Sequence, residues 1–300
     1  MKTKIQDMTS GSPGRLIILF AIPLMLGNIC QQLYTMVDTM VVGQVAGVEA
    51  LAALGAVDFL MWVVTGISTG LTQGFSIQLS QYYGAKDFEN LRKSLAHSYR
   101  LTAFIAIGVF ILSQSFASLV LTGLHTPSNI IGMSLLYLRI IFCGIPATAA
   151  YNMFASALRA MGNSKTPLTA MIIASVLNVS LDILFVAGFG WGVAGAAIAT
   201  VIAQSFSAVY CFLILRRIDI VHLTRADFMP ASGMNARLMK LGIPVVFQNI
   251  IIGVGGLVVQ YVINGYYSYK QALWSAGNGC YFLWICHRYL CGSESGSRKD

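Results

Sequence analysis

Two acidic residues stand inside stretches that otherwise have the composition of lipid-embedded helices. Asp182 lies in one such stretch, with Asn178 one helical turn before it on the same helix face. A short Gly-rich turn at 190–192 leads from this stretch into a second apolar helix. The other acid, Asp38, lies in the first hydrophobic helix of the chain. An ionisable group at membrane depth costs about 2.5–3.5 kcal/mol on insertion scales, so the pair predicts an ion or substrate path.

The chemistry open to this pair depends on its surroundings. A hard cation such as Na⁺ needs several carboxylate, carbonyl or hydroxyl oxygens as ligands, and Asn178 and Asp182 could supply two of them. If the bound ion is H⁺, burial and like charge would favour a proton on one carboxylate of a close pair. The structural alternative is a pair of acids that cap or bridge helices.

The composition places the chain in a membrane. Of its 300 residues, 56% are hydrophobic and 10% are charged, and its mean hydropathy is +0.72. Soluble domains carry about 25% charged residues, so we expect an all-α polytopic membrane protein. The expected helices, each near or above the ~20 residues that span hydrocarbon, cover residues 16–42, 50–75, 101–121, 131–158, 168–186, 193–215 and 238–263.

The basic residues predict the orientation of these helices. Lys and Arg flank alternate loops, whereas the intervening loops near 44–49, 123–130 and 187–192 contain neither. This positive-inside pattern predicts a multi-pass protein of the plasma (inner) membrane with a cytoplasmic N-terminus. It also explains the net charge of +8 by contact with anionic lipid headgroups, without nucleic acid as a partner. The two acids then lie toward the outer half of the membrane.

A short internal repeat predicts the domain organisation. The segment Ile22-Pro23-Leu24-Met25-Leu26-Gly27-Asn28 is echoed by Ile243-Pro244-Val245-Val246-Phe247-Gln248-Asn249. The offset of 221 residues (244 − 23) corresponds to about six helices, and parallel repeats of this kind occur in transporters. We expect a six-helix lobe at 1–215, a cytoplasmic linker at 216–236, the first helix of a second lobe at 237–264, and an aberrant tail at 265–300.

Other polar or helix-breaking residues give weaker predictions. Pro23 should kink the first helix, where it could act as a hinge beside a cavity. Cavity roles are also open to Gln31, Asp58 and Arg139, although interface snorkelling is the plainer interpretation of Arg139. The letters Gly190-x-Gly192-x-x-Gly195 match a dinucleotide fingerprint but follow no soluble strand, so we interpret them as a tight turn between closely packed helices.

Several motifs together resemble one known family. They are Ile22-Pro23 with Asp38, Gln81…Gly84-Ala85, Leu158-Arg159-Ala160-Met161-Gly162-Asn163-Ser164-Lys165-Thr166-Pro167, and Asn178-x-x-x-Asp182 followed by Gly192-Val193-Ala194-Gly195-Ala196-Ala197. Through them, the chain from about residue 10 to 264 resembles the multidrug and toxic compound extrusion (MATE) family of cation-coupled efflux transporters.

The resemblance implies a fold, an activity and a site. Members of the family have twelve helices in two six-helix lobes that face a central cavity. The implied activity is that of an antiporter, monomeric at full length and without a cofactor, which exports amphipathic, often cationic drugs in exchange for Na⁺ or H⁺. In the subgroup that this chain resembles, a cation site in the first lobe uses side chains that match Asp38, Asn178, Asp182 and Thr200 here, and Na⁺ is the metal expected there.

The sequence after about residue 265 departs from the family pattern. Back-translating Ala272 to Asp300 with permitted codons and reading one base later can give a peptide that contains Gln-x-x-Gly-Ala, the pattern of Gln81 to Ala85. We therefore expect a frameshifted or truncated second half, and a non-functional fragment is one alternative for the function of the chain.

Two other functions compete with drug efflux. A flippase for lipid-linked saccharides, from the same superfamily, would favour a cavity rich in Arg or Lys for pyrophosphate, and here Arg139 alone is a candidate. An intramembrane aspartyl protease would use the two acids, but it needs a Gly-x-Gly-Asp context, whereas Val179-Ser180-Leu181 precedes Asp182. We therefore expect a transporter and not an enzyme.

Overall fold

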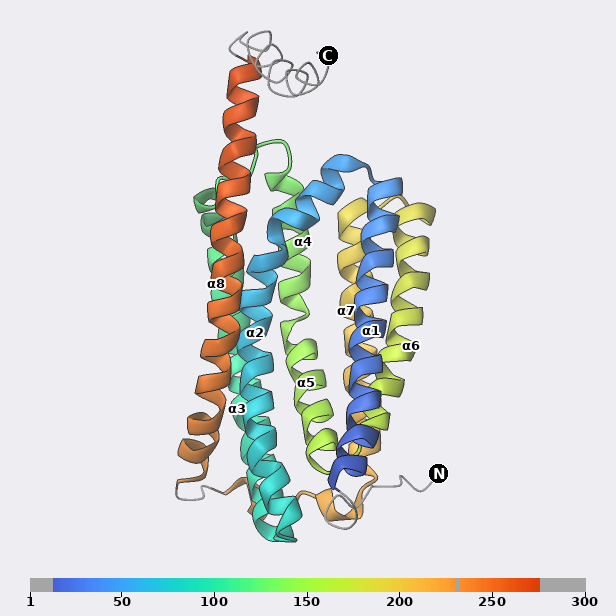
Figure 1. Ribbon diagram of the computed structural model, residues 1–300, viewed down its shortest axis with the longest axis vertical. Coiled ribbons are helices and arrows are strands. Elements are labelled where there is room, and N and C mark those ends of the chain that lie inside the picture. Colours follow the sequence, from blue (N-terminus) through green and yellow to red (C-terminus); the bar gives the residue numbers. More distant parts are fainter. Residues whose placement is uncertain (1–12, 230–232, 276–300) are drawn as a thin grey trace, which may run out of the picture.

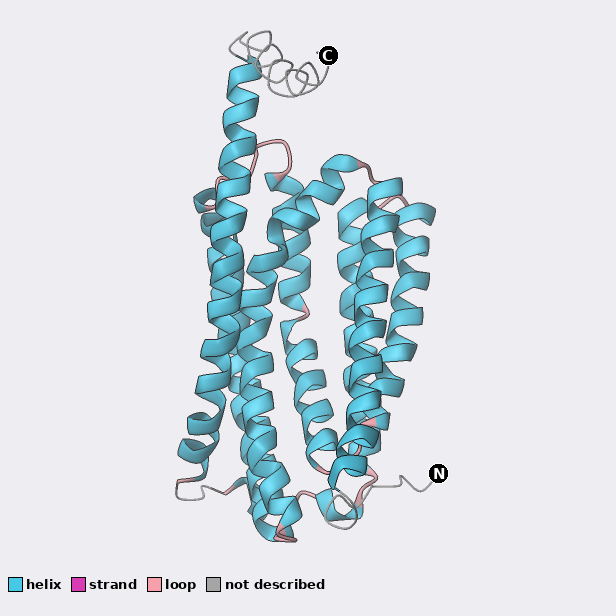
Figure 2. Cartoon of the chain, viewed as in Figure 1, coloured by secondary structure: helices cyan, strands magenta, loops and turns pink. Residues whose placement is uncertain are grey.

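A computed structural model describes residues 13–229 and 233–275 of the chain, and these residues are almost entirely helical, with no strand among them (Figures 1 and 2). The elements in chain order are α1 (Pro13–Val45), α2 (Val48–Gly84), α3 (Phe88–Gly123), α4 (Ile131–Cys143), α5 (Ile145–Ala160), α6 (Lys165–Asp182), the π-helical turn η1 (Ile183–Gly188), α7 (Gly192–Arg216), the 3₁₀ turns η2 (Asp219–Val221) and η3 (Arg225–Phe228), and α8 (Met234–Ser275). The all-α prediction is confirmed.

The helices have the length and composition of membrane spans. Within the described residues, five are long and apolar enough to cross a bilayer: α2, α3, α6 with η1, α7 and α8. The bent pair of α4 and α5 makes a sixth if it counts as one span. The helix α1, with 33 residues, exceeds the ~20 residues that a crossing requires and runs beside α6 (Figure 1).

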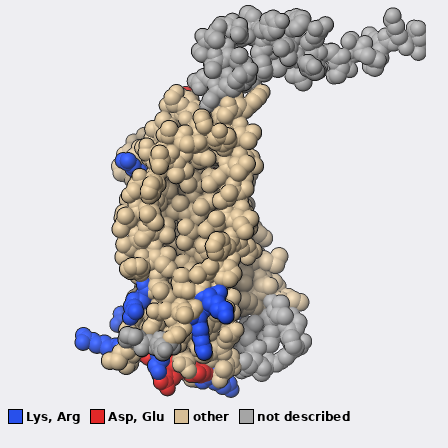
Figure 3. Space-filling view, turned by 90° about the vertical axis from the view of Figure 1, so that its left-hand side faces the viewer, with Lys and Arg blue, Asp and Glu red and all other residues tan. Residues whose placement is uncertain are grey.

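The surface of the bundle is divided into an apolar body and one basic end. Large apolar side chains are exposed along the helices, for example Met25, Phe104, Val176 and Ile251, and an extended apolar surface of this kind marks contact with lipid. Lys and Arg gather at the lower end of the bundle, where a few acidic side chains also lie (Figure 3). We call this region the basic end, and it matches the loops that the charge pattern predicted to be cytoplasmic.

The helices pack in two groups around α4 and α5. The first group is α1, α6 and α7, and the second is α2, α3 and α8 (Figure 1). The helix α5 contacts both α2 and α7, so it joins the groups. Buried apolar residues form one core near the basic end, around Phe75 and Leu158, and another toward the opposite end, around Leu60 and Phe142.

The fourth expected helix is broken. The prediction of one continuous helix over 131–158 is wrong in this detail, because α4 and α5 meet at Gly144 with a bend of 47°. Pro146 lies in the first turn of α5, where its missing N–H cannot bond into the preceding turn. Gly144 also approaches α7 closely, since a Cβ atom there would lie 2.7 Å from the Val201 side chain.

The segment between the helices expected at 50–75 and 101–121 is mostly helix. The helix α2 continues to Gly84 and α3 begins at Phe88, so only a short turn separates them. Within the turn Lys86 has a φ of 58°, and Asp87 caps α3 by accepting a hydrogen bond from the Asn90 backbone N–H at 3.1 Å. The two hydrogen bonds from Asn90 to the Asp87 carboxylate hold the pKa of this acid below its usual range.

The helix α8 packs along α2 through a row of glycines. Gly66, Gly70 and Gly74 recur every fourth residue and face α8. A Cβ atom on Gly70 would lie 2.8 Å from the backbone of Val246, so the two helices meet at backbone distance. The Asn249 side-chain amide donates across this seam to the Gly66 carbonyl at 3.1 Å. Small residues and an interhelical amide bond of this kind are how membrane helices associate.

The segment between α7 and α8 is anchored on α3. The buried His97 ring lies 3.1 Å from the Met229 carbonyl oxygen and 2.7 Å from Asn235 Oδ1. Arg100 donates to the Phe228 carbonyl oxygen at 3.1 Å. The predicted linker at 216–236 therefore has a fixed path across the basic end in its described part, although its cytoplasmic location stays a prediction.

The remaining sequence predictions about local structure have mixed outcomes. Gly190 and Gly192 have φ values of 69° and 53°, and a Cβ atom on Gly195 would lie 3.0 Å from Phe185, so the tight turn between close helices is confirmed. The last helix continues to Ser275, past the expected end near residue 263, so the first part of the predicted aberrant tail is helical. The rest of that tail, 276–300, lies outside the described residues.

Candidate functional site

The two membrane acids lie side by side. Asp38 is in the last third of α1, and Asp182 is the last residue of α6. Their side chains are within hydrogen-bonding reach of each other, and they are 7% and 0% exposed. The packing of α1 against α6 therefore joins two carboxyl groups that are 144 residues apart in sequence (182 − 38).

The other two predicted ligands lie beside Asp182. Asn178 is one turn earlier on α6 and is 1% exposed. Its Nδ2 donates to Oγ1 of Thr200 on α7 at 3.4 Å. This bond leaves the amide oxygen Oδ1 of Asn178 free for another partner. The structure thus brings together all four residues of the predicted cation site from three helices.

The oxygens of this group lack hydrogen-bond donors. Asp38 Oδ1, Asn178 Oδ1 and both carboxylate oxygens of Asp182 are buried, and no donor from the described residues bonds to them. Buried polar atoms are nearly always paired, because an unpaired one costs about 1–3 kcal/mol. A proton between the carboxyl groups or a cation among the oxygens would satisfy them, and both fit a set that consists of acceptors only.

A π-helical turn begins directly after the site. The residues Ile183–Gly188 form η1, which continues α6 with wider hydrogen-bond spacing. Such insertions in α-helices occur frequently at functional sites. Here the turn changes the helical phase immediately beyond Asp182, so the residues on either side of it do not follow one regular helix face.

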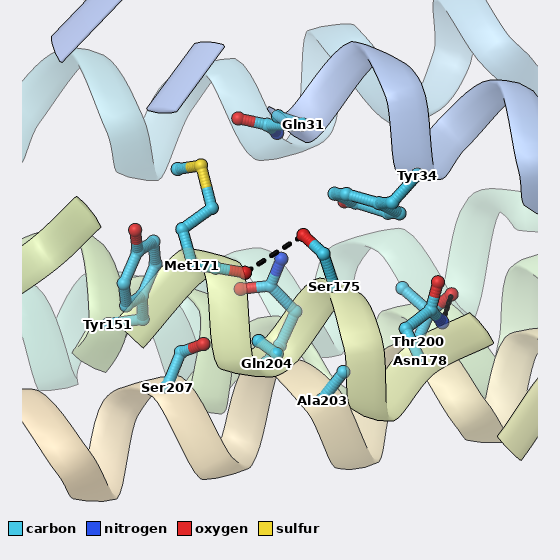
Figure 4. Close-up of a pocket in the computed structure, with 11 residues that line it drawn as sticks. Gln31, Tyr34, Tyr151, Met171, Ser175, Asn178, Thr200, Ala203, Gln204 and Ser207 are labelled. Atoms are coloured by element: carbon cyan, nitrogen blue, oxygen red, sulfur yellow. Dashed lines mark hydrogen bonds between the residues drawn. The ribbon is translucent and has the colours of Figure 1, made fainter. Parts of the chain in front are cut away.

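A narrow pocket, lined by polar and apolar side chains, runs from Asn178 and Thr200 into the lobe (Figure 4). The space in which the centre of a water molecule can move is about 30 Å³, enough for one or two waters or an ion and too small for a drug. Asn178 and Thr200 lie at one end and Tyr151 at the other, with Gln204 and Ser207 between them (Figure 4).

Three residues near the site were not predicted from the sequence. Tyr34 lies one helical turn before Asp38 and lines the same pocket as Gln204, which lies one turn after Thr200. Helical spacing from the predicted ligands would have found both of them. The third, Tyr137 of α4, is 5% exposed and within electrostatic range of Asp38 and Asp182. No spacing in the sequence connects it to either acid.

The residues for which the sequence suggested a cavity or hinge role do not lie together. Gln31 lines the pocket on α1 (Figure 4). Pro23 is half-buried inside α1, which continues as helix on both sides of it, so a hinge at Pro23 stays a prediction. Asp58 and Arg139 are exposed, on α2 and α4, and neither lines the pocket. A cavity role for these two stays a prediction.

The chain is similar in sequence to a known protein family. The family profile MatE matches residues 23–184. The chain is 32% identical over 263 residues to the Bacillus subtilis "Probable multidrug resistance protein YpnP", and 28% identical over 281 residues to YoeA of the same organism. These alignments cover 88% and 91% of this chain but 59% and 61% of the relatives, so the chain spans about three fifths of their length.

A solved structure has the same fold. It is an outward-facing multidrug resistance MATE family transporter of the MOP superfamily, with a TM-score of 0.78 and 25% identity. The similarity covers 83% of this chain and 56% of the solved chain. The expected arrangement, a six-helix lobe followed by the start of a second lobe, is therefore confirmed.

Proposed function

Because this chain belongs to the MATE family of multidrug transporters, we propose that it supplies the lobe that binds the coupling cation of a drug antiporter, between Asp38 and Asp182. The family consists of transporters and not enzymes. Export by the whole transporter, of amphipathic and often cationic compounds in exchange for Na⁺ or H⁺, is part of this proposal, as is the cytoplasmic position of the N-terminus.

One observation carries the proposal. The carboxyl groups of Asp38 and Asp182 lie together, and four buried oxygens of Asp38, Asn178 and Asp182 have no donor among the described residues. Thr200 adds a hydroxyl oxygen beside Asn178. Na⁺ would be held by these four side chains, and H⁺ would be shared by the two carboxyl groups. In either case the ion joins α1 to α6, so its arrival and departure favour different positions of α1, which is what coupling to a second ligand requires.

The flippase alternative has less support. Recognition of a pyrophosphate needs several cationic side chains in a cavity. Arg139 is exposed on α4, and no Lys or Arg of the described residues lines the pocket beside the acid pair.

A melting experiment on the purified chain tests the cation site. Two ionised carboxylates in close contact repel each other, so we expect the melting temperature to fall as the pH rises in K⁺ buffer. If the coupling ion is Na⁺, replacing K⁺ by Na⁺ at the higher pH will raise the melting temperature again by several degrees. The same exchange at low pH will change the melting temperature little, because a proton already occupies the site. If the coupling ion is H⁺, the pH dependence will appear in both salts. A melting temperature that responds to neither pH nor Na⁺ contradicts the proposal.

A further inference from the structure

A crevice at the basic end of the bundle contains an arginine with few partners. It lies between α1, α2 and the end of α5, and its volume is about 220 Å³. Its walls include Phe20 of α1, Ser80 and Tyr83 of α2, and Arg159 and Gly162 at the end of α5. Whereas α2 packs along α5, α1 packs on α6, and the crevice occupies the space between these groups. It is separate from the cation site.

Arg159 is not neutralised by a carboxylate in the described part of the chain. Its guanidinium donates from Nη2 to Ser156 Oγ at 3.2 Å. The titratable groups that affect it electrostatically are Tyr151 and Cys211, neither of which is a carboxylic acid. None of the described ion pairs includes Arg159. A guanidinium has five N–H donors, so several of them remain for a ligand in the crevice.

Two lysines follow the walls of the crevice closely in sequence. Lys86 follows the crevice wall at Gly84 by two residues, and Lys165 follows Gly162 by three. The carboxylate nearest to Lys86 in sequence, Asp87, is engaged by Asn90 through bonds of 3.1 and 2.7 Å. A half-buried cation with cationic neighbours attracts an anion, and the planar guanidinium matches the geometry of a phosphate.

We propose that this crevice binds the phosphate group of an anionic phospholipid, with Arg159 as its main ligand. The Ser80 hydroxyl, which donates to the Ile77 carbonyl oxygen at 2.8 Å in the free chain, would turn to the phosphate as a second donor. The position indicates a lipid, because the crevice lies where the membrane-spanning helices reach the basic end of the bundle. The adjoining surface of α1 also suits acyl chains, since Ile18 and Ile22 are 60% and 47% exposed on either side of Phe20.

Native mass spectrometry of the detergent-purified chain tests the site. The chain is titrated with phosphatidylglycerol, with diacylglycerol as the phosphate-free lipid, and with inorganic phosphate as the lipid-free source. We expect phosphatidylglycerol to bind about tenfold more tightly than diacylglycerol. Arg159→Gln should lower the affinity for phosphatidylglycerol by about the same factor. Arg159→Lys keeps the charge but not the planar guanidinium, so it should lower this affinity less than Arg159→Gln does. The matched control is Arg216→Gln, an exposed arginine at the same end of the bundle, which should change binding less than twofold.

Three results would overturn the assignment. They are equal binding of phosphatidylglycerol by wild type and Arg159→Gln, equal binding of the two lipids by wild type, and displacement of phosphatidylglycerol by an equal concentration of inorganic phosphate. If Arg159→Gln does not fold, Ser80→Ala replaces it. That variant should weaken phosphatidylglycerol binding a few-fold and leave diacylglycerol binding unchanged, and unchanged binding of both lipids would count against the site.

Discussion

Asp182→Asn will make the chain more stable in alkaline K⁺ buffer and insensitive to Na⁺. The substitution removes one of two buried carboxylates in contact, and with it the repulsion between them. It also removes a charged ligand, so the affinity for the coupling cation should fall by a factor of about 10 to 100, equivalent to about 1.4–2.7 kcal/mol. Thermal melting with and without Na⁺ measures both effects, and Asp38→Asn should behave in the same way.

The matched control for this pair is Asp58→Asn. Asp58 is also an acid in a membrane helix, but it is exposed. Its substitution should leave the dependence on pH and Na⁺ as in the wild type. If Asp58→Asn abolishes that dependence, or if Asp182→Asn preserves it, the cation site has been assigned to the wrong carboxylates.

Gly74→Leu will separate α8 from α2. The backbone of Gly242 occupies the space that a side chain at Gly74 would need, so the two helices must move apart. Overpacking of this kind costs about 1–3 kcal/mol where side chains can adjust, and more where backbone is in the way. The matched control is Gly55→Leu on the same helix, where a Cβ atom would meet nothing within 4 Å.

Cross-linking reports this separation. A Cβ atom at Gly66 would lie 3.2 Å from Cβ of Asn249, slightly less than the about 3.5–4.5 Å of a disulfide, so a small outward shift of the helices would allow the bond. The double variant Gly66→Cys/Asn249→Cys should therefore form an intramolecular disulfide, whereas each single variant should not. Adding Gly74→Leu should reduce the yield severalfold, and adding Gly55→Leu should not. Equal yields in these two backgrounds would show that the glycine row does not control the seam.

Hydropathy predicted which helices exist better than where they end. The helix α3 begins at Phe88. Hydropathy places its start near residue 101, because the first turns of the helix carry charged residues. Those charges nevertheless favour helix, since Asp87 caps it and Glu89 pairs with Lys93 at 2.7 Å. The break at Gly144 was missed although Pro146 was visible, because membrane helices often tolerate a proline without a break.

The candidate site was only partly predictable from residue spacing. Asn178 and Asp182 share a helix face through their spacing, and this part needed no further information. The contact of Asp38 with Asp182 depends on how α1 packs on α6, and the match of Thr200 came from the family resemblance. Tyr137 of α4 lies within electrostatic range of the acids, through packing that is not encoded in any local pattern.

The most direct measurement of the central claim is infrared difference spectroscopy of the purified chain. The C=O stretch of a protonated carboxyl group is recorded while the pH is raised and while Na⁺ replaces K⁺. We expect one buried carboxyl to lose its proton as the pH rises, and addition of Na⁺ to promote that loss if Na⁺ binds the same oxygens. Both Asp38→Asn and Asp182→Asn should lack this signal, and Asp58→Asn should retain it. A spectrum with no titrating buried carboxyl, or one that the two substitutions leave unchanged, would contradict a shared cation site between Asp38 and Asp182.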